Sequence, residues 1–230
     1  MVAKTIFGVA ASVLTVAGIF VLAGRWDWTG GWVYVGLLAG GHAASMLVTW
    51  RVNPELIRRR AHVGRGTKRW DIVIMTALGV SYVATLVVGA LDGGRWGGGA
   101  GGAGGAGMPG WGLWAGAGLF ALYLLNLTWV MTSNPFFEKT ARIQADRGQR
   151  VIDTGPYAFI RHPGYLGGIL GFVAGTPLVL GSWWSFVPAG AAAVCLVVRT
   201  ALEDSMLRRE LPGYAEYATR VRSRLVPWLW

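Results

Sequence analysis

The residue types best suited to chemistry gather in residues 153–167, DTGPYAFIRHPGYLG, where two tyrosines and an Arg-His pair lie among two prolines and three glycines. The prolines and glycines make this stretch too irregular for a plain helix. An acidic pair, Glu203-Asp204, follows about forty residues after the Arg-His pair. We predict that the first stretch forms one half of a functional site and that the acidic pair forms the other half.

Together these side chains suit a small zwitterion that also carries an onium group. A guanidinium can hold a carboxylate in a bidentate fork, a carboxylate can hold an ammonium, and aromatic faces attract onium cations. A plainer interpretation stays open, in which Arg199 and Glu203 form an i, i+4 pair on one helix and the rest are ordinary interfacial residues. The candidates are Tyr157, Arg161, His162, Tyr165, Arg199, Glu203, Asp204, Tyr214 and Tyr217.

The composition indicates the elements that must position them. Hydrophobic residues make up 53% of the chain and charged residues only 14%, against about 25% charged in soluble domains. Several apolar runs approach the roughly 20 residues that cross a bilayer as a helix, and most of the 13 tryptophans lie near the ends of those runs, as interfacial aromatic residues do. We therefore predict an all-α polytopic membrane protein.

About six transmembrane helices are predicted, over residues 5–23, 30–50, 70–91, 111–131, 165–180 and 183–202. The first run resembles the core of a signal peptide, but LAGRWDW is a poor cleavage site, so a retained helix is expected. Only Gly181-Ser182 separates the last two runs, which predicts an antiparallel C-terminal hairpin. Such a hairpin returns Leu202 to the membrane face from which Tyr165 enters, and so brings the two halves of the site together.

The charges agree with this topology. With the amino terminus inside, 19 of the 21 Lys and Arg fall on one side of the membrane, which predicts cytoplasmic N- and C-termini, in the inner membrane if the host is bacterial. The net charge of +10 therefore reflects membrane topology and not a nucleic-acid partner. The single cysteine, Cys195, is expected to pack in the core, and no metal site is predicted.

Three further features have a bland and a functional interpretation. The basic segment 51–69 is expected to touch anionic headgroups, with substrate binding as the second possibility. The Gly-rich segment 93–110 contains GAGGAG but follows no strand, so an outer linker is favoured over a dinucleotide site. His42 lies in an apolar run, where a functional role is the default, yet its small neighbours favour a hydrogen-bonded packing residue.

The pieces GPYAFIRHPGYLG, a helical hairpin, and then ED-x(5)-E-L-P-G-Y-x-x-Y with RLVP near the end resemble the isoprenylcysteine carboxyl methyltransferase (ICMT) family, which is grouped with phospholipid methyltransferases. The close resemblance runs from about residue 142 to the end, and NPELIRRRA and GTKRWD also recur in bacterial members. The shared pattern is R-H-P-x-Y-x-G followed by a Glu-Glu pair, in which Asp204 replaces the second Glu. The matching positions are Arg161, His162, Pro163, Tyr165, Gly167 and Glu203.

This resemblance implies S-adenosylmethionine as cofactor and in-line displacement at its sulfonium methyl. Arg161 or His162 would bind the methionyl carboxylate, and Glu203 the ammonium or ribose hydroxyls; these three residues are the expected catalytic group. Arg199 and Tyr214 are expected to bind substrate. The expected cofactor-binding residues are Tyr157, Arg161, His162, Pro163, Tyr165, Gly167, Glu203 and Asp204.

The resemblance also implies a lipophilic acceptor, a small molecule or a prenylated substrate, that enters from the bilayer and its lipids. A carboxylate acceptor is favoured, with a phospholipid, amine or thiol as the alternative; an NADPH-dependent sterol-type reductase and a transporter or scaffold are disfavoured. Residues 1–134 are expected to hold four helices and the outer Gly-rich loop, and residues 135–230 the methyltransferase core. The sequence indicates no oligomeric state.

Overall fold

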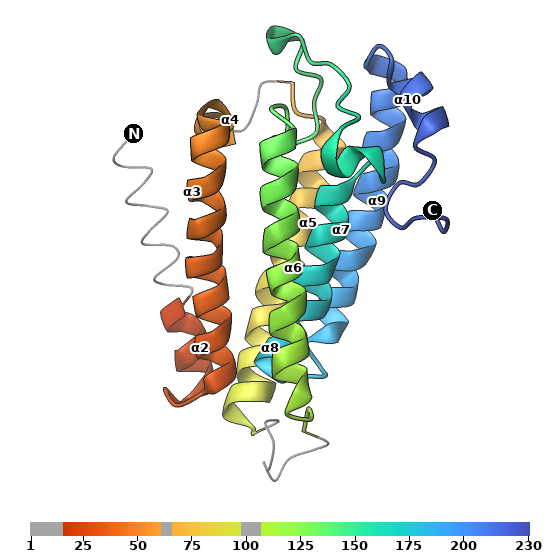
Figure 1. The fold of residues 1–230 in the computed structure, drawn as a ribbon. Helices are drawn as coiled ribbons and strands as arrows, with labels where there is room; N and C mark the ends of the chain where they lie inside the picture. Colours follow the sequence, from red (N-terminus) through yellow and green to blue (C-terminus); the bar gives the residue numbers. More distant parts are fainter. Residues whose placement is uncertain (1–15, 61–65, 98–106) are drawn as a thin grey trace.

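The computed structural model describes residues 16–60, 66–97 and 107–230. Within these ranges every regular element is helical, and the long helices lie side by side in one bundle (Figure 1). Five of them are long and apolar enough to cross a membrane: Thr29–Val52, Arg69–Arg95, Trp111–Ser133, Pro163–Leu180 and Phe186–Glu210. The prediction of a polytopic all-α membrane protein is therefore confirmed.

Three of the five spans are composite, because π-helical stretches interrupt them. The first span is α2 (Thr29–Val35), η1 (Gly36–Gly41) and α3 (His42–Val52), and the second is α5 (Arg69–Gly89) and η2 (Ala90–Arg95). The third is the uninterrupted α6 (Trp111–Ser133). The last two are α7 (Pro163–Gly168), η5 (Ile169–Gly175) and α8 (Thr176–Leu180), and then α9 (Phe186–Glu210). The short elements at their ends are α4 (Pro54–Arg60), η3 (Ala145–Arg147), η4 (Gly155–Ala158) and α10 (Tyr214–Arg220).

Five predicted spans correspond to these helices, and the sixth, residues 5–23, lies mostly outside the described ranges, although residues 16–23 are helical. The predicted exit from the membrane at Leu202 is not a helix end. α9 continues to Glu210, because no helix breaker occurs before Pro212. Glu203 and Asp204 therefore lie on a rigid helix and not in a tail.

The C-terminal hairpin is confirmed. Its connection is longer than predicted, since α8 ends at Leu180 and α9 begins at Phe186. Gly181 turns the chain with φ 72°, a conformation that glycine adopts without steric cost. Ser182 Oγ then accepts the backbone N–H of Ser185 at 3.0 Å, and α9 returns along η5 and α5.

Glycines bring α6 and the first arm of the hairpin into close contact. A Cβ on Gly116 would lie 2.7 Å from Leu178 Cβ and 2.8 Å from the carbonyl oxygen of Gly175. A Cβ on Gly171 would lie 2.6 Å from the Tyr123 ring. Membrane helices associate through such small residues because lipid provides no hydrophobic force between them. This packing fixes the depth at which α7 begins.

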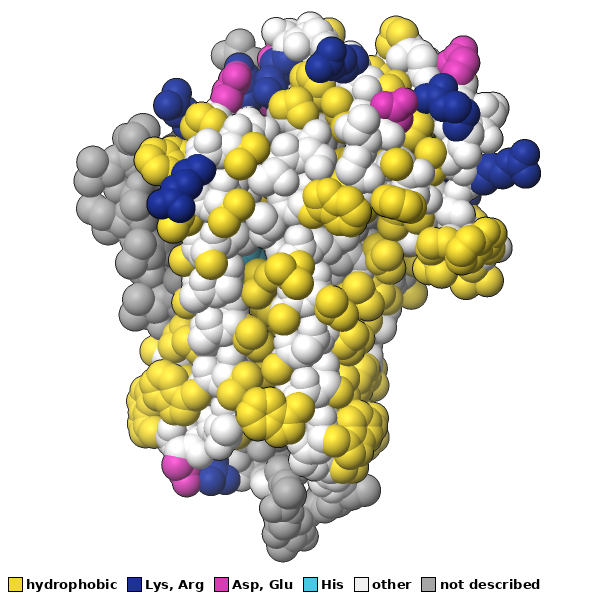
Figure 2. Space-filling model, viewed as in Figure 1, with side chains coloured by type: hydrophobic (Ala, Val, Ile, Leu, Met, Phe, Trp, Pro, Cys, Tyr) yellow, Lys and Arg dark blue, Asp and Glu magenta, His cyan; other side chains and the backbone are white. Residues whose placement is uncertain are grey.

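The charged residues gather at one end of the bundle, which we call the basic end; it comprises α4, residues 134–162 and α10 (Figures 1 and 2). At the opposite end Arg25 pairs with Asp27 at 2.7 Å, and Arg95 donates to backbone carbonyls. The assignment of the basic end to the cytoplasm and the division of the chain at residue 134 stay predictions. The central part of the Gly-rich segment, 98–106, lies outside the described ranges.

His42 has the hydrogen bonds that the packing interpretation predicts. Its Nδ1 lies 2.9 Å from the Leu38 carbonyl oxygen, and its Nε2 lies 2.9 Å from the Tyr123 hydroxyl. Because a carbonyl can only accept, Nδ1 carries the proton, and Nε2 accepts from the tyrosine. His42 thus ties α3 to α6 within the bundle.

We predict that Gly116→Ala lowers the free energy of unfolding by roughly 1–3 kcal/mol, the usual cost of overpacking, because the added methyl meets the backbone of α8. Gly118→Ala is the matched control, since a Cβ there has nothing within 4 Å. Denaturant unfolding in detergent micelles measures both. Equal stability of the two variants would contradict the close packing of α6 on α8.

Candidate functional site

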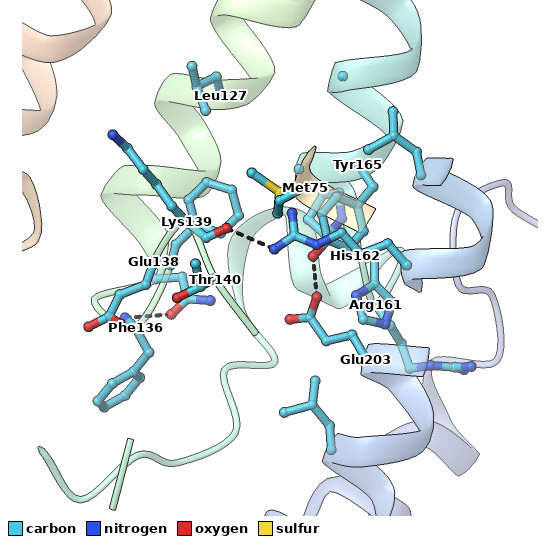
Figure 3. Close-up of a pocket in the computed structure, with 18 of the residues that line it drawn as sticks. Met75, Leu127, Phe136, Glu138, Lys139, Thr140, Arg161, His162, Tyr165 and Glu203 are labelled. Carbon is cyan, nitrogen blue, oxygen red and sulfur yellow. Dashed lines mark hydrogen bonds between the residues drawn. The ribbon is translucent and has the colours of Figure 1, made fainter. Parts of the chain in front are cut away.

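A cavity of about 580 Å³ opens at the basic end and reaches into the bundle. The part of its wall nearest the basic end is polar. The part deeper in the bundle is apolar, with Met75, Leu78, Leu127, Phe172 and Val173. Figure 3 shows Glu138, Lys139 and Thr140 on one side and Arg161, His162, Tyr165 and Glu203 on the other. The hairpin therefore brings the Arg-His stretch and Glu203 to one cavity, as the sequence predicts.

Arg161 is held almost completely within the protein. Its Nε donates to Asp204 Oδ1 at 2.7 Å and its Nη2 to Oδ2 at 3.3 Å. Its Nη1 donates to the carbonyl oxygens of Val221 and Arg222, both at 2.7 Å. Four of the five N–H groups of a guanidinium are thus engaged, so at most one remains for a ligand. The expected contact between Arg161 and a cofactor carboxylate stays a prediction.

Asp204 is the centre of this charge cluster and is completely buried. Besides the hydrogen bonds from Arg161, its carboxylate accepts one from Nε of Arg208 at 3.0 Å and one from Nε of Arg224 at 3.1 Å. The Tyr214 hydroxyl donates to Oδ1 at 3.1 Å, and His162 Nε2 lies 3.5 Å from the same oxygen. Burial, and then the charge of Asp204, raise the pKa of the Tyr214 phenol, so it stays a donor.

The C-terminal segment after α10 closes over the Arg-His pair. The backbone N–H of Arg161 donates to the Ser223 carbonyl at 3.0 Å, and that of His162 to the Arg224 carbonyl at 2.9 Å. Arg224 therefore contacts Asp204 by its side chain and His162 by its backbone. Sequence reasoning missed Arg224, although it begins the RLVP segment that carries part of the family resemblance.

Tyr165 and Glu203 line the cavity on the same side (Figure 3). Pro163 occupies the first turn of α7, where its missing N–H is not needed, and Tyr165 follows two residues later. The Tyr165 hydroxyl donates to Oε2 of Glu203, and its ring stacks on His162 with centroids 5.7 Å apart. Oε1 of Glu203 accepts no hydrogen bond from the described residues, so it is open to a ligand.

Arg199 has a different partner from the one that its spacing suggests. Its Nε donates to Asp71 Oδ1 at 2.7 Å, so the i, i+4 pair with Glu203 does not form. Asp71 is fully buried and also accepts the backbone N–H of Ala141 at 2.7 Å. Asp71 was missed by sequence reasoning; its place in the recurrent GTKRWD segment was the available signal. Arg199 still lines the cavity, with Cζ 5.1 Å from the centre of the Tyr165 ring.

Tyr157 and Tyr217 support the wall from the loop and from α10. The Tyr157 hydroxyl accepts from Asn134 Nδ2 at 2.8 Å, and the Tyr217 hydroxyl donates to the Tyr157 carbonyl at 2.7 Å. Burial raises the pKa of the Tyr157 phenol. Both tyrosines line the cavity, with their hydroxyls already engaged.

Two predicted site residues, Gly167 and Asp204, do not line the cavity. Gly167 packs against α6, where a Cβ would lie 2.4 Å from Oδ1 of Asn126. For these two residues the contacts indicate helix packing and charge pairing. The predicted residues that do line the cavity are Tyr157, Arg161, His162, Pro163, Tyr165, Arg199, Glu203, Tyr214 and Tyr217.

The cavity joins charged groups at the basic end to an apolar interior between the spans. Residues 115–209 match the model of the Isoprenylcysteine carboxyl methyltransferase (ICMT) family. This match supports an ICMT-like membrane methyltransferase family and confirms the sequence resemblance. No curated protein matches the chain.

The matched region starts within α6 and ends one residue before the end of α9. It therefore includes the Arg-His stretch, the hairpin and both acidic residues. Asp71 on α5, Tyr214 on α10 and the closing segment with Arg224 lie outside it. These outer residues complete the charge pairs of Arg199 and Asp204.

We predict that Asp204→Asn lowers the free energy of unfolding by about 3–5 kcal/mol, because three guanidiniums lose their shared counter-charge in a buried place. Asp153→Asn removes an exposed pair with Arg220 and serves as the control, with an expected loss below about 1 kcal/mol. Thermal and denaturant unfolding without cofactor measure both. A fully stable Asp204→Asn protein would contradict the structural role of this carboxylate.

Proposed function

We propose that this protein transfers a methyl group from S-adenosylmethionine to a lipophilic acceptor at the cytoplasmic face of the membrane. The observation that supports this proposal most strongly is the shape and lining of the cavity. Charged and aromatic side chains at the basic end give way to an apolar interior between the spans. A polar methyl donor and a lipophilic acceptor require these two environments in contact.

The residues of the polar part of the cavity fit S-adenosylmethionine as the methyl donor. Oε1 of Glu203 has no hydrogen-bond donor among the described residues and can accept an ammonium or ribose hydroxyl. The stacked rings of Tyr165 and His162 line the same part of the cavity and would form an aromatic wall beside the sulfonium. When bound, the cofactor supplies an activated methyl group. His162, or the remaining N–H of Arg161, would hold its carboxylate.

The residues of the chain then act mainly by positioning and by exclusion of water. Arg161 is held by Asp204 and two carbonyls, so the adjacent His162 is fixed in place. A rigid wall of this kind holds two reactants at the distance and angle that displacement needs. The buried surroundings keep water from competing for the methyl group.

A carboxylate is the acceptor that this wall suits best. It is already ionised at neutral pH, so methyl transfer to it requires no general base. An amine, a phospholipid headgroup amine or a thiol would have to lose a proton, and His162 is the candidate base for that step. The acceptor would enter from the bilayer, because the apolar part of the cavity wall is built from the spans.

We predict that Glu203→Gln weakens the binding of S-adenosylmethionine by roughly 10- to 100-fold, because a charged hydrogen bond is replaced by a neutral one. Glu210→Gln is the matched control, since Glu210 lies on the same helix and pairs with Lys68. Isothermal calorimetry of the full-length protein in detergent measures both affinities.

Two results would overturn the proposed function. One is wild-type protein that binds NADPH and not S-adenosylmethionine, which would indicate a sterol-type reductase. The other is flux of a solute through liposomes that contain the protein, without binding of the methyl donor. Equal affinity of wild type and Glu203→Gln would overturn only the role of Glu203.

We predict that the methylated product is an ester. Membrane extract incubated with tritiated S-adenosylmethionine and the purified protein should yield a lipophilic product that releases labelled methanol in mild base. The unlabelled product is then identified by its mass. A label that resists base would instead indicate an amine or thiol acceptor, and Glu203→Gln protein provides the background.

A further inference from the structure

Arg60 is a half-buried arginine that lines the cavity and has no carboxylate partner. It ends α4, which packs on α3, whereas Glu203 and His162 enter the cavity from the hairpin. All 11 Asp and Glu lie in the described ranges. None forms an ion pair with Arg60 within 4.0 Å. Among the described residues no carboxylate therefore pairs directly with Arg60, and Glu138 acts on its charge only from a distance.

The nearby acidic residue is already paired. Glu138 accepts Nε of Arg142 at 2.9 Å and lies 3.8 Å from Nη1 of Arg147. The neighbouring Lys139 is basic, and burial together with the charge of Arg60 lowers the pKa of its ammonium. Burial also lowers the pKa of Arg60. A charge in such surroundings is costly unless an anion accompanies it.

The guanidinium is held in a fixed orientation. Its Nη1 donates to the Phe137 carbonyl at 2.8 Å, and its Cζ lies 4.9 Å from the centre of the Phe137 ring. That ring fills the space beside Gly164, where a Cβ would be 2.7 Å from it. Nε and Nη2 make no hydrogen bond with the described residues. These two N–H groups form the edge that binds a carboxylate in a bidentate fork.

Arg161 and Arg199 are buried arginines that also line the cavity, but neither can fill this role as well. Arg161 has at most one free N–H, because Asp204 and two carbonyls take the rest. Arg199 has its charge balanced by Asp71. Of these three arginines, Arg60 alone lacks an ion pair and keeps both N–H groups of its bidentate edge without a partner among the described residues.

We propose that Arg60 binds the carboxylate of the methyl acceptor and thereby selects an acidic lipophilic substrate. This inference rests on the proposed function and adds a residue outside the region that matches the family model. The carboxylate lies on the fork of Arg60 from the side of α3 and α6, while the methyl donor lies against Glu203 from the hairpin side. Lys139 adds a second positive charge next to the fork.

The test uses N-acetyl-S-farnesylcysteine as the acidic probe and its carboxamide as the neutral probe, without cofactor, by calorimetry on the full-length protein. Wild type is expected to bind the acid at least tenfold more tightly than the amide. Arg60→Gln should abolish this preference, with roughly tenfold or more loss for the acid and none for the amide. Arg60→Lys keeps the charge without the fork and should give an intermediate preference.

Arg58→Gln is the matched control, because Arg58 lies on the same short helix and is exposed; it should leave the acid preference unchanged. S-adenosylmethionine affinity is measured in parallel and should stay within twofold of wild type in Arg60→Gln. Loss of cofactor affinity with an unchanged acid preference would place the donor carboxylate at Arg60 and overturn the proposal.

Three further outcomes would also overturn it. In the first, Arg60→Gln loses the same affinity for the acid as for the amide. In the second, wild type binds both probes equally well, and in the third it does not bind the acid. Absence of S-adenosylmethionine binding in wild type would refute the proposed function separately, since the probe measurements contain no cofactor.

Discussion

The buried carboxylate of Asp204 is the interaction on which the basic end of this protein depends. Three arginines, a tyrosine and a histidine converge on it from the segment before α7, from α9 and α10, and from the C-terminal segment after α10. An ion in surroundings of low dielectric constant costs several kcal/mol unless it is paired and hydrogen-bonded. If one of these elements moved, the carboxylate and its other partners would lose part of their pairing in a buried place. The elements therefore hold one another in position, and the cavity wall that they form is rigid.

A second buried ion pair, Asp71 with Arg199, holds the part of the cavity wall near residues 139–141 in position. It joins α5 to α9, and its carboxylate also fixes the loop at Ala141. With these two aspartates paired to arginines, two of the other charged groups that line the cavity are suited to hold the proposed ligands. Within the described ranges, one carboxylate oxygen of Glu203 and the Nε and Nη2 groups of Arg60 make no hydrogen bond. A zwitterionic donor and an anionic acceptor would complement that arrangement.

The spans reach this arrangement through backbone contact and not through hydrophobic force between helices. Gly116 and Gly175 let α6 approach the first arm of the hairpin until backbone atoms nearly touch. The same arm carries Pro163 and Tyr165 at its upper end. The depth of the Tyr165 ring in the bundle is thus set by glycines more than a turn below it, which links helix packing to the shape of the site.

The sequence by itself determined the all-α membrane class, the hairpin and the meeting of the Arg-His stretch with Glu203, because apolar length and turn residues are local properties. It also carried the family resemblance, which rests on motif order. Only the tertiary structure decided which charges pair: Arg199 with Asp71 and not Glu203, and Arg161 with Asp204. Those choices depend on distances between helices that are remote in sequence. The same distances leave Arg60 without a carboxylate, since the side chains that could balance it are bound elsewhere.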